Sequence, residues 1–198
     1  IESVKKKDCD IVISAGNTGA LLVISKLNLN MIENIDKPAL SALWPNKKGM
    51  SVVLDLGANI ECSSKNLFDF SVMGASLYKS LYPSETPNVA LLNIGSEELK
   101  GNETIKETYK ILNDKKTEDF NFTGYIEGNQ LMNGNVNVIV SDGFTGNIAL
   151  KTAEGTANFI TDELKKALGG SLIGKISSLI NISNLKKFKK RLDPRLYN

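Results

Sequence analysis

Histidine is absent from the 198 residues of this sequence, and cysteine occurs only twice, at Cys9 and Cys62. Without histidine, neither a Ser-His-Asp nor a Cys-His relay can form within this stretch. The two cysteines form no CxxC pattern, which argues against a disulfide scaffold and the usual zinc sites and favours a reduced, intracellular setting. We therefore predict no metal and no cofactor, and any catalysis must rely on other groups.

Long apolar runs are absent too. No run approaches the roughly 18 residues that a helix needs to cross a bilayer, and no secretory signal peptide is visible. The sequence begins with Ile1 rather than Met, and both ends are rich in lysine, so we interpret it as a fragment that lacks both ends of a longer protein. With 41% hydrophobic and 23% charged residues it can bury a core as one domain, and we expect a cytoplasmic location.

The formal net charge is only +2, but the charges are distributed unevenly. Residues 161–198 contain nine Lys and Arg against three Asp and Glu, a net +6, which leaves −4 for residues 1–160. A basic end on a mildly acidic body indicates an anionic surface or partner, whereas the alternative is a solvated helix face. We predict no nucleic-acid partner.

Four short apolar runs, each followed by a turn of Gly, Asn or Asp and then by helix-like sequence, dominate the pattern. They are residues 11–14, 51–55, 89–94 and 136–141. Continuous β-branched runs are typical of parallel strands buried on both faces. Further short strands are expected at 39–43 and 122–127, and helices at 20–30, 66–81, 102–112 and 146–168. This alternation predicts an α/β fold with a mostly parallel, doubly wound sheet, helices on both faces and a core spanning residues 1–168.

The turns are the candidate site, because parallel strands bring their carboxyl ends to one edge and open α/β folds bind ligands there. Glycine lets backbone approach a ligand closely, and a helix N-terminus offers free N–H groups to an anion. The candidate residues are Gly16, Asn17, Thr18, Gly19, Asp55, Gly57, Asn59, Asn93, Gly95, Lys100, Asn102, Asp142, Gly143, Gly146 and Asn147.

Each of these turns has a simpler alternative, namely a connection without function. Asp55 either orients a nearby lysine or caps a helix. Lys100 either contacts a phosphate or pairs with Glu97 or Glu103 at the surface, which contributes at most about 1 kcal/mol. Four turns together, each rich in donors, favour a site.

Residues 169–198 have a different character and form a second predicted unit. Apolar residues at helical spacing precede and then alternate with a lysine cluster at Lys186, Lys187, Lys189 and Lys190. The apolar residues are Leu172, Ile173, Ile176, Leu179, Ile180, Leu185, Phe188 and Leu192. This composition is typical of a helix on an anionic bilayer, and the alternative is a helix packed on its own domain or in a dimer interface.

Eight segments, in this order and spacing, carry a family resemblance from about residue 8 to the end. They are SAGNTGAL (14–21), DKPAL (36–40), LDLGAN (54–59), FSVMG (70–74), VALLNIG (89–95), KGNE (100–103), GYIEG (124–128) and SDGFTGNIALKT (141–152). Together they resemble the phosphate acyltransferase family of bacterial phospholipid synthesis. The resemblance implies a three-layer α/β/α sandwich similar to the isopropylmalate dehydrogenase and phosphotransacetylase group.

The resemblance also implies an activity, namely transfer of a fatty acyl group from acyl carrier protein to inorganic phosphate, giving acyl phosphate. It further implies a homodimer and peripheral association with an anionic membrane, which favours membrane docking for residues 172–192. The sequence departs from the family because an Asp-Ala-Met-Gly-Gly-Asp segment at the start and a Gly-rich, His-containing segment at the end are missing.

Phosphate dianion is already a nucleophile near neutral pH, so a site without histidine suits this reaction. The largest contributions to catalysis then come from positioning the reactants and from oriented N–H donors. We expect Asn17, Thr18 and Gly19 with Lys100 and Asn102 to bind phosphate or acyl phosphate. Asn147 and the Gly143–Gly146 backbone would serve the oxyanion, while Asp55 and Asp142 orient these donors.

Two other functions remain open. A phosphotransacetylase acting on acyl-coenzyme A shares the fold and the phosphate chemistry, and a non-catalytic acyl-carrier- or lipid-binding protein would bind without forming acyl phosphate. A nicotinamide dehydrogenase is disfavoured because the first turn lacks the G-x-G-x-x-G fingerprint.

Overall fold

One mixed sheet organises the molecule. The structure, a computed structural model, describes residues 1–115 and 117–192, with the side chains of residues 191 and 192 excepted. The strand order is β1-β2-β5-β3-β4. The strands are β1 (Ser41–Pro45), β2 (Met50–Leu54), β3 (Asn88–Asn93), β4 (Asn121–Glu127) and β5 (Val138–Val140). Strand β1 runs antiparallel to β2, and every other neighbouring pair is parallel, so the carboxyl ends of β2, β5, β3 and β4 share one edge.

The helices begin where the sequence supplies side-chain caps. Their bounds are α1 (Glu2–Lys5), α2 (Thr18–Asn28), α3 (Ser64–Leu81), α4 (Glu103–Asp114), the 3-10 turn η1 (Gly128–Gln130), α5 (Gly143–Gly169), α6 (Leu172–Ile180) and α7 (Ile182–Leu192). Ser63 and Asn66 form a reciprocal capping box at the start of α3. Asn102 caps α4 and Asp142 caps α5, each through its side chain.

Helices cover both faces of the sheet. On one face, Val52, Leu54 and Val138 pack with Phe70 of α3 and Ile105 of α4. On the other, Val53, Ala90 and Ile139 pack with Leu56 and with Ala149, Leu150 and Ala153 of α5. Alternation along β2 explains this division, because successive side chains point to opposite faces. The three-layer α/β/α sandwich predicted from the sequence is confirmed.

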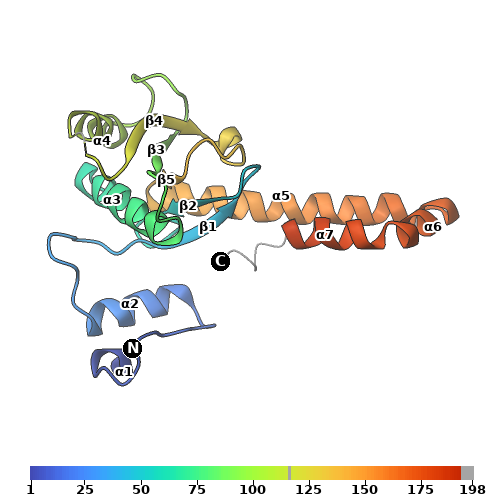
Figure 1. Cartoon of the computed structure of the whole chain (residues 1–198), viewed down its shortest axis with the longest axis horizontal. Helices are drawn as coiled ribbons and strands as arrows, with labels where there is room; N and C mark the ends of the chain where they lie inside the picture. Colours follow the sequence, from blue (N-terminus) through green and yellow to red (C-terminus); the bar gives the residue numbers. More distant parts are fainter. Residues whose placement is uncertain (116, 193–198) are drawn as a thin grey trace.

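The predicted first strand is wrong. Residues 11–14 form no strand, Ile11 and Ile13 are 73% and 95% exposed, and every residue from 11 to 20 is exposed. Helix α2, which follows this segment, lies with α1 apart from the sheet (Figure 1). A β-branched run becomes a strand only when a neighbouring strand supplies its hydrogen bonds, and no described strand pairs with this one.

The C-terminal part of the molecule projects from the body. Figure 1 shows the second half of α5 extending well beyond the sheet, with α6 at its far end and α7 leading back. The predicted apolar residues of α6 are exposed there, including Leu172 at 79% and Ile173 at 81%. None of the described helices is both long and apolar enough to cross a membrane. The end of the predicted segment, the side chain of Leu192 and residues 193–198, lies outside the described residues.

Candidate functional site

The candidate site lies at the edge where β2, β3 and β5 end. A pocket of about 510 Å³ opens there between the loop after β2 and the N-termini of α4 and α5. It is lined by Ile60, Glu61, Cys62, Leu67, Asn102, Thr104, Ile105, Asp142, Phe144 and Thr145. Such a place suits ligand binding because loops that follow parallel strands converge at one edge of the sheet.

Asp55 holds together the loop that follows β2. Its carboxylate is fully buried and accepts hydrogen bonds from the backbone N–H groups of Gly57, Ala58 and Asn59, at 3.1, 2.9 and 2.8 Å. It also accepts from the Asn59 amide at 2.7 Å and from the N–H of Leu40 at 3.0 Å. Among the residues that the structure describes, the carboxylate therefore neither caps a helix nor orients a lysine. It shapes residues 55–59 for whatever binds beside them.

Two glycines let the start of α5 lie directly on that loop. The Gly143 N–H donates to the Asn59 carbonyl at 2.7 Å, and a Cβ at Gly143 would come within 2.6 Å of the same carbonyl. A Cβ at Gly146 would overlap the Asp55 carbonyl. Both glycines are thus required for close packing, and their N–H groups already have protein partners, since Gly146 donates to Asp142.

The amide of Asn147 lies one turn further along α5. It is exposed and sits against Gly57, whose φ of +140° favours glycine. The first-turn N–H of Phe144 and the Asn147 side chain have no hydrogen-bond partner among the described residues. They are the donors that α5 can offer to a ligand at this edge.

The loop after β3 is closed by Asn93. Its amide donates to the carbonyls of Gly95 and Lys100, both at 3.1 Å. Gly101 completes the turn at a φ of +94°, and a Cβ there would come within 2.5 Å of the Asn93 oxygen. Lys100 is exposed in this loop and makes no ion pair among the described residues. Neither predicted surface pair, with Glu97 or with Glu103, is present, since Glu103 binds Lys106 instead.

Cys62 lies in the pocket, and its surroundings make it a poor nucleophile. Burial, followed by the charge of Asp55, raises the pKa of the Cys62 thiol, and Lys37 opposes this only in part. A thiol with a raised pKa is mostly protonated at neutral pH, and the thiolate is the reactive form. The raised pKa therefore gives no support to covalent catalysis by Cys62.

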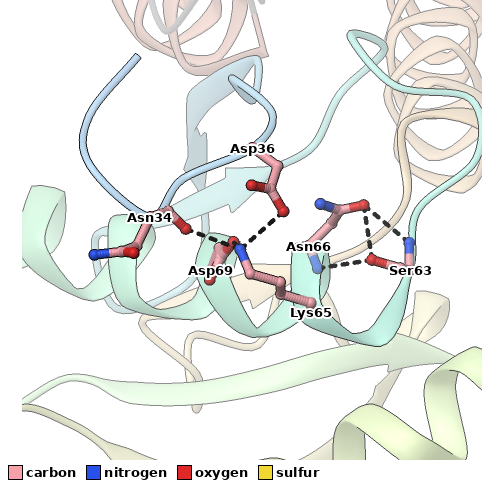
Figure 2. Close-up of polar contacts among 6 residues, drawn as sticks. All are labelled: Asn34, Asp36, Ser63, Lys65, Asn66 and Asp69. Carbon is pink, nitrogen blue, oxygen red and sulfur yellow. Dashed lines mark hydrogen bonds and ion pairs between the residues drawn. The ribbon is translucent and has the colours of Figure 1, made fainter.

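A lysine clamp ties the segment before β1 to α3 (Figure 2). The Lys65 ammonium donates to the carbonyl of Asn34 at 2.8 Å and contacts the carboxylates of Asp36 and Asp69 at 2.9 and 2.8 Å. The hydrogen bonds to Asp69 and Asp36 raise the pKa of Lys65. The clamp matters for the site because the next residues along this segment bind its loop: the Asn59 amide donates to the carbonyl of Pro38 at 2.7 Å.

The predicted first turn does not join this edge. Gly16, Asn17, Thr18 and Gly19 are exposed, and Asn17 caps α2 by accepting from Ala20 at 3.0 Å. The structure thus brings together Asp55, Gly57, Asn59, Gly143, Gly146 and Asn147, and it places Asn102 and Asp142 in the pocket wall. The loop of Asn93, Gly95 and Lys100 adjoins Asn102. No group of three or more His, Cys, Asp or Glu side chains that could hold a metal ion occurs in the described part of the chain.

A family model described as "Fatty acid synthesis protein" matches residues 1–198. The chain belongs to this fatty acid synthesis protein family. It is 82% identical over all of its residues to a protein of Pelagibacter ubique (strain HTCC1062) named phosphate acyltransferase. A protein of the same name from Maricaulis maris (strain MCS10) is 44% identical over the whole chain. The chain spans 60% and 56% of the lengths of these two relatives.

The fold of this family member is similar to that of two solved phosphotransacetylase structures. A phosphotransacetylase from Streptococcus pyogenes superposes with a TM-score of 0.62 over 78% of this chain and 53% of that one, at 16% identity. A phosphotransacetylase from Staphylococcus aureus gives a TM-score of 0.54 over 68% of this chain and 46% of that one, at 17% identity. At such identities the likeness shows the fold alone, and it agrees with the architecture expected from the sequence.

Several pocket residues of this family member were missed by reasoning from sequence. Ile60 and Thr104 lie just outside the turns that drew attention, and Phe144 and Thr145 lie inside one, where only their backbone was given a role. Cys62 was considered only as a disulfide or zinc residue. The sequence did contain a signal that could have identified Thr104. It lies two residues after the N-cap of α4, and the first turn of a helix that follows a parallel strand lies at the shared edge of the sheet.

Proposed function

We propose that the full-length protein transfers a fatty acyl group from acyl carrier protein to inorganic phosphate and so supplies acyl phosphate for phospholipid synthesis. The observation that carries this proposal is the 82% identity, over every residue of the chain, to a relative named phosphate acyltransferase. The edge described above supports it, since it combines a tightly hydrogen-bonded loop, two helix N-termini and an exposed lysine.

The reaction needs three tasks at this edge. Phosphate must be held against the thioester carbonyl, the carbonyl oxygen must be stabilised as it gains charge, and the thiolate must leave. Lys100 is the cation for phosphate, because it is exposed beside the N-terminus of α4. The N–H of Phe144 and the amide of Asn147 are the donors for the oxyanion, because the N–H groups of Gly143 and Gly146 are already used within the protein.

Asp55 and Asp142 act by shaping the site. Asp55 fixes residues 57–59 through their N–H groups, and Asp142 fixes the first turn of α5 by accepting from the Thr145 N–H and hydroxyl, both at 2.8 Å. Our expectation from the sequence also assigns the turn at Gly16–Gly19 to phosphate or acyl binding. That role is a proposal for the full-length protein, because in this chain the turn lies away from the edge.

Hydroxylamine trapping of acyl phosphate tests the function directly. The full-length protein should form acyl hydroxamate from acyl carrier protein thioester only when phosphate is present. Lys100→Ala and Asn147→Ala should each lower turnover by more than about threefold, while Lys110→Ala, an exposed lysine on α4, serves as the matched control. Turnover with acyl-coenzyme A but not with acyl carrier protein would indicate a phosphotransacetylase, and binding without acyl phosphate would indicate a non-catalytic protein.

We further propose that α6 and α7 attach the protein peripherally to an anionic membrane, and that it forms a homodimer. Support comes from the exposed apolar side chains of α6 and from the four lysines that flank Phe188 on α7. An apolar face beside basic residues binds anionic bilayers through both area and charge. Liposome sedimentation tests this. Binding that ignores anionic lipid content and survives charge reversal at Lys186, Lys187, Lys189 and Lys190 would contradict it.

A further inference from the structure

The segment before β1, residues 34–40, lies against the loop that follows β2, and we call it the crossing segment. Its first part is held on α3 by the lysine clamp (Figure 2). Further along, the carbonyl of Pro38 accepts from the Asn59 amide at 2.7 Å, and the N–H of Leu40 donates to Asp55 at 3.0 Å. These contacts fix the first part of the loop, which belongs to the candidate site.

The second part of that loop, residues 60–62, is held by a different side chain. The hydrogen bonds that the Asp55 carboxylate accepts from the loop end at Asn59. Beyond that point, the Lys37 ammonium donates to the Glu61 carbonyl at 2.8 Å. Because a hydrogen bond from a charged donor is stronger than a neutral one, this is the strongest contact that reaches residues 60–62 in the described part of the chain.

The sequence and the fold both place Lys37 for this contact. Pro38 follows it, and the residue before a proline favours extended backbone, as a segment that crosses a loop requires. Burial raises the pKa of the Cys62 thiol in the pocket, the charges of Asp55 and Asp142 add to this, and the charge of Lys37 opposes them. The half-buried Lys37 ammonium therefore also places positive charge beside the pocket wall.

The position of residues 60–62 matters because they form one wall of the pocket. Phe144 and Thr145, at the start of α5, form another. The loop and the helix meet where the Gly143 N–H donates to the Asn59 carbonyl at 2.7 Å. The N–H of Phe144 is the donor proposed for the oxyanion, and a misplacement of about 1 Å in such a site can lower the rate about a hundredfold.

We propose that Lys37 is a positioning residue of this site, which holds residues 60–62 in place through the Glu61 carbonyl. Its charge also offsets those of Asp55 and Asp142 beside the pocket. Lys37 acts through the loop and not by contact with a reacting atom. The inference rests on the proposed acyl transfer, to which it adds the residue that orders one wall of the pocket.

Steady-state kinetics of the full-length protein, with acyl carrier protein thioester and phosphate varied independently, tests this role. Lys37→Met removes the donor and the charge but keeps the side-chain bulk, and it should lower kcat about tenfold while the KM for phosphate stays within about twofold. Lys37→Arg restores donor and charge and should recover kcat to within about threefold of wild type. Lys47→Met is the matched control, because Lys47 donates to Asn133 at 3.1 Å from the turn between β1 and β2, and it should change neither constant.

Three kinetic results would overturn the role of Lys37. One is a kcat of Lys37→Met within about threefold of wild type. Another is a raised KM for phosphate with an unchanged kcat, because Lys37 would then bind phosphate directly. The third is an equally low kcat in Lys37→Met and Lys37→Arg, because the donor and the charge would then not be what the site needs.

Limited proteolysis with a glutamate-specific protease measures the order of the loop without catalysis. Lys37→Met should speed cleavage after Glu61 about tenfold, because cleavage follows the population of the locally open state. Cleavage after Glu118, an exposed residue between α4 and β4, is the internal reference and should not change. Equal acceleration at both bonds would indicate a general loss of stability, and unchanged cleavage after Glu61 would show that other contacts hold the loop. Either result overturns the inference.

The proposed function can fail separately. If the wild-type protein forms no acyl phosphate from any thioester, acyl transfer is wrong. The proteolysis of Lys37→Met and Lys37→Arg still decides whether Lys37 holds residues 60–62, because it needs no substrate.

Discussion

Asp55 and Asp142 both follow a buried strand, yet they stabilise different parts of the site. Asp55 gathers five N–H donors from the loop after β2 and from the segment before β1. Asp142 serves only the first turn of its own helix. Because hydrogen bonds to a buried charge are stronger than neutral ones, the two carboxylates should differ in their effect on stability.

Asp55→Asn should lower the free energy of unfolding by about 3 kcal/mol. The substitution replaces one of the two accepting carboxylate oxygens with an NH₂ group, which is a donor and would face the N–H groups that now donate to Asp55. Urea denaturation measures the loss. Asp119→Asn is the control, since Asp119 is 76% exposed and pairs with Lys79 at 3.2 Å, and it should change stability by no more than about 0.5 kcal/mol. Equal losses in the two variants would contradict the role assigned to Asp55.

Tyr78 should make stability depend on alkaline pH. Burial and the hydrogen bond to Glu85 raise the pKa of Tyr78 to about 12 from an ordinary value of 10.0, and the Asn137 amide, which donates to its oxygen, only partly opposes this. The folded state therefore holds this proton more tightly than the unfolded state. Its contribution is complete below about pH 10 and is lost as pH rises toward about 12. Denaturation at several pH values should show this decline, and Tyr78→Phe should make it shallower.

At the scale of elements, the packing of α5 depends on two glycines in its first turns, which have no side chains. Gly143 and Gly146 leave room for the backbone of residues 55 and 59, whereas a Cβ at Gly155, further along the same helix, would meet no described atom within 4 Å. Glycine weakens a helix interior, so it persists where packing requires it. The same residue type therefore has opposite expected effects at two positions of one helix.

Gly146→Ala should destabilise the protein by about 3 kcal/mol or more, because its Cβ would overlap the Asp55 carbonyl. Gly155→Ala should stabilise it by about 0.5–1 kcal/mol, because alanine favours the helix and has open space at this position. Thermal or urea denaturation of both variants decides the matter. A Gly146→Ala variant as stable as wild type would show that α5 is not held by this contact.

The Lys65 clamp should control the mobility of the segment before β1. In Lys65→Met, amide hydrogen exchange at residues 33–38 should become several-fold faster, because Asn34 and Asp36 lose their anchor on α3. Lys79→Met, which breaks an exposed pair on the same helix, is the control and should leave this segment unchanged. Retained protection in Lys65→Met would mean that Lys37 and Asn59 hold the segment without the clamp.

At the scale of the whole molecule, one group of exposed apolar side chains lies on the projecting part, and another lies in residues 11–32. Phe159 and Ile160 on α5 are 66% and 47% exposed, and α6 adds five more large apolar residues. Patches of this kind on a globular body mark interaction surfaces. The apolar surface of the projection begins within α5, so it extends into residues 1–168.

If the proposed homodimer covers this surface, Phe159→Asp should shift the full-length protein toward monomer, because a charge would then be buried against apolar side chains. Light scattering coupled to size-exclusion chromatography measures the mass. Leu81→Asp makes the same kind of change at a 46%-exposed position on α3 and should leave the mass unaltered. A Phe159→Asp protein with the wild-type mass would place any dimer contact elsewhere.

Much of the fold followed from sequence pattern. The runs at 51–55, 89–94 and 136–141 became β2, β3 and β5 because continuous β-branched residues suit strands that are covered on both faces. These are local or periodic properties, so one sequence sufficed to recognise them.

Only the tertiary structure decided what each turn residue does. The same kind of run at residues 11–14 formed no strand, because pairing depends on a neighbour that sequence pattern cannot supply. Gly143 and Gly146 proved to be packing residues, and the pocket formed because three loops, far apart in the sequence, meet at one edge. The sequence by itself thus determined most of the strands and helices and the family, since these depend on periodicity and order along the chain. The roles of individual side chains depend on distances between loops, and only the folded chain sets those.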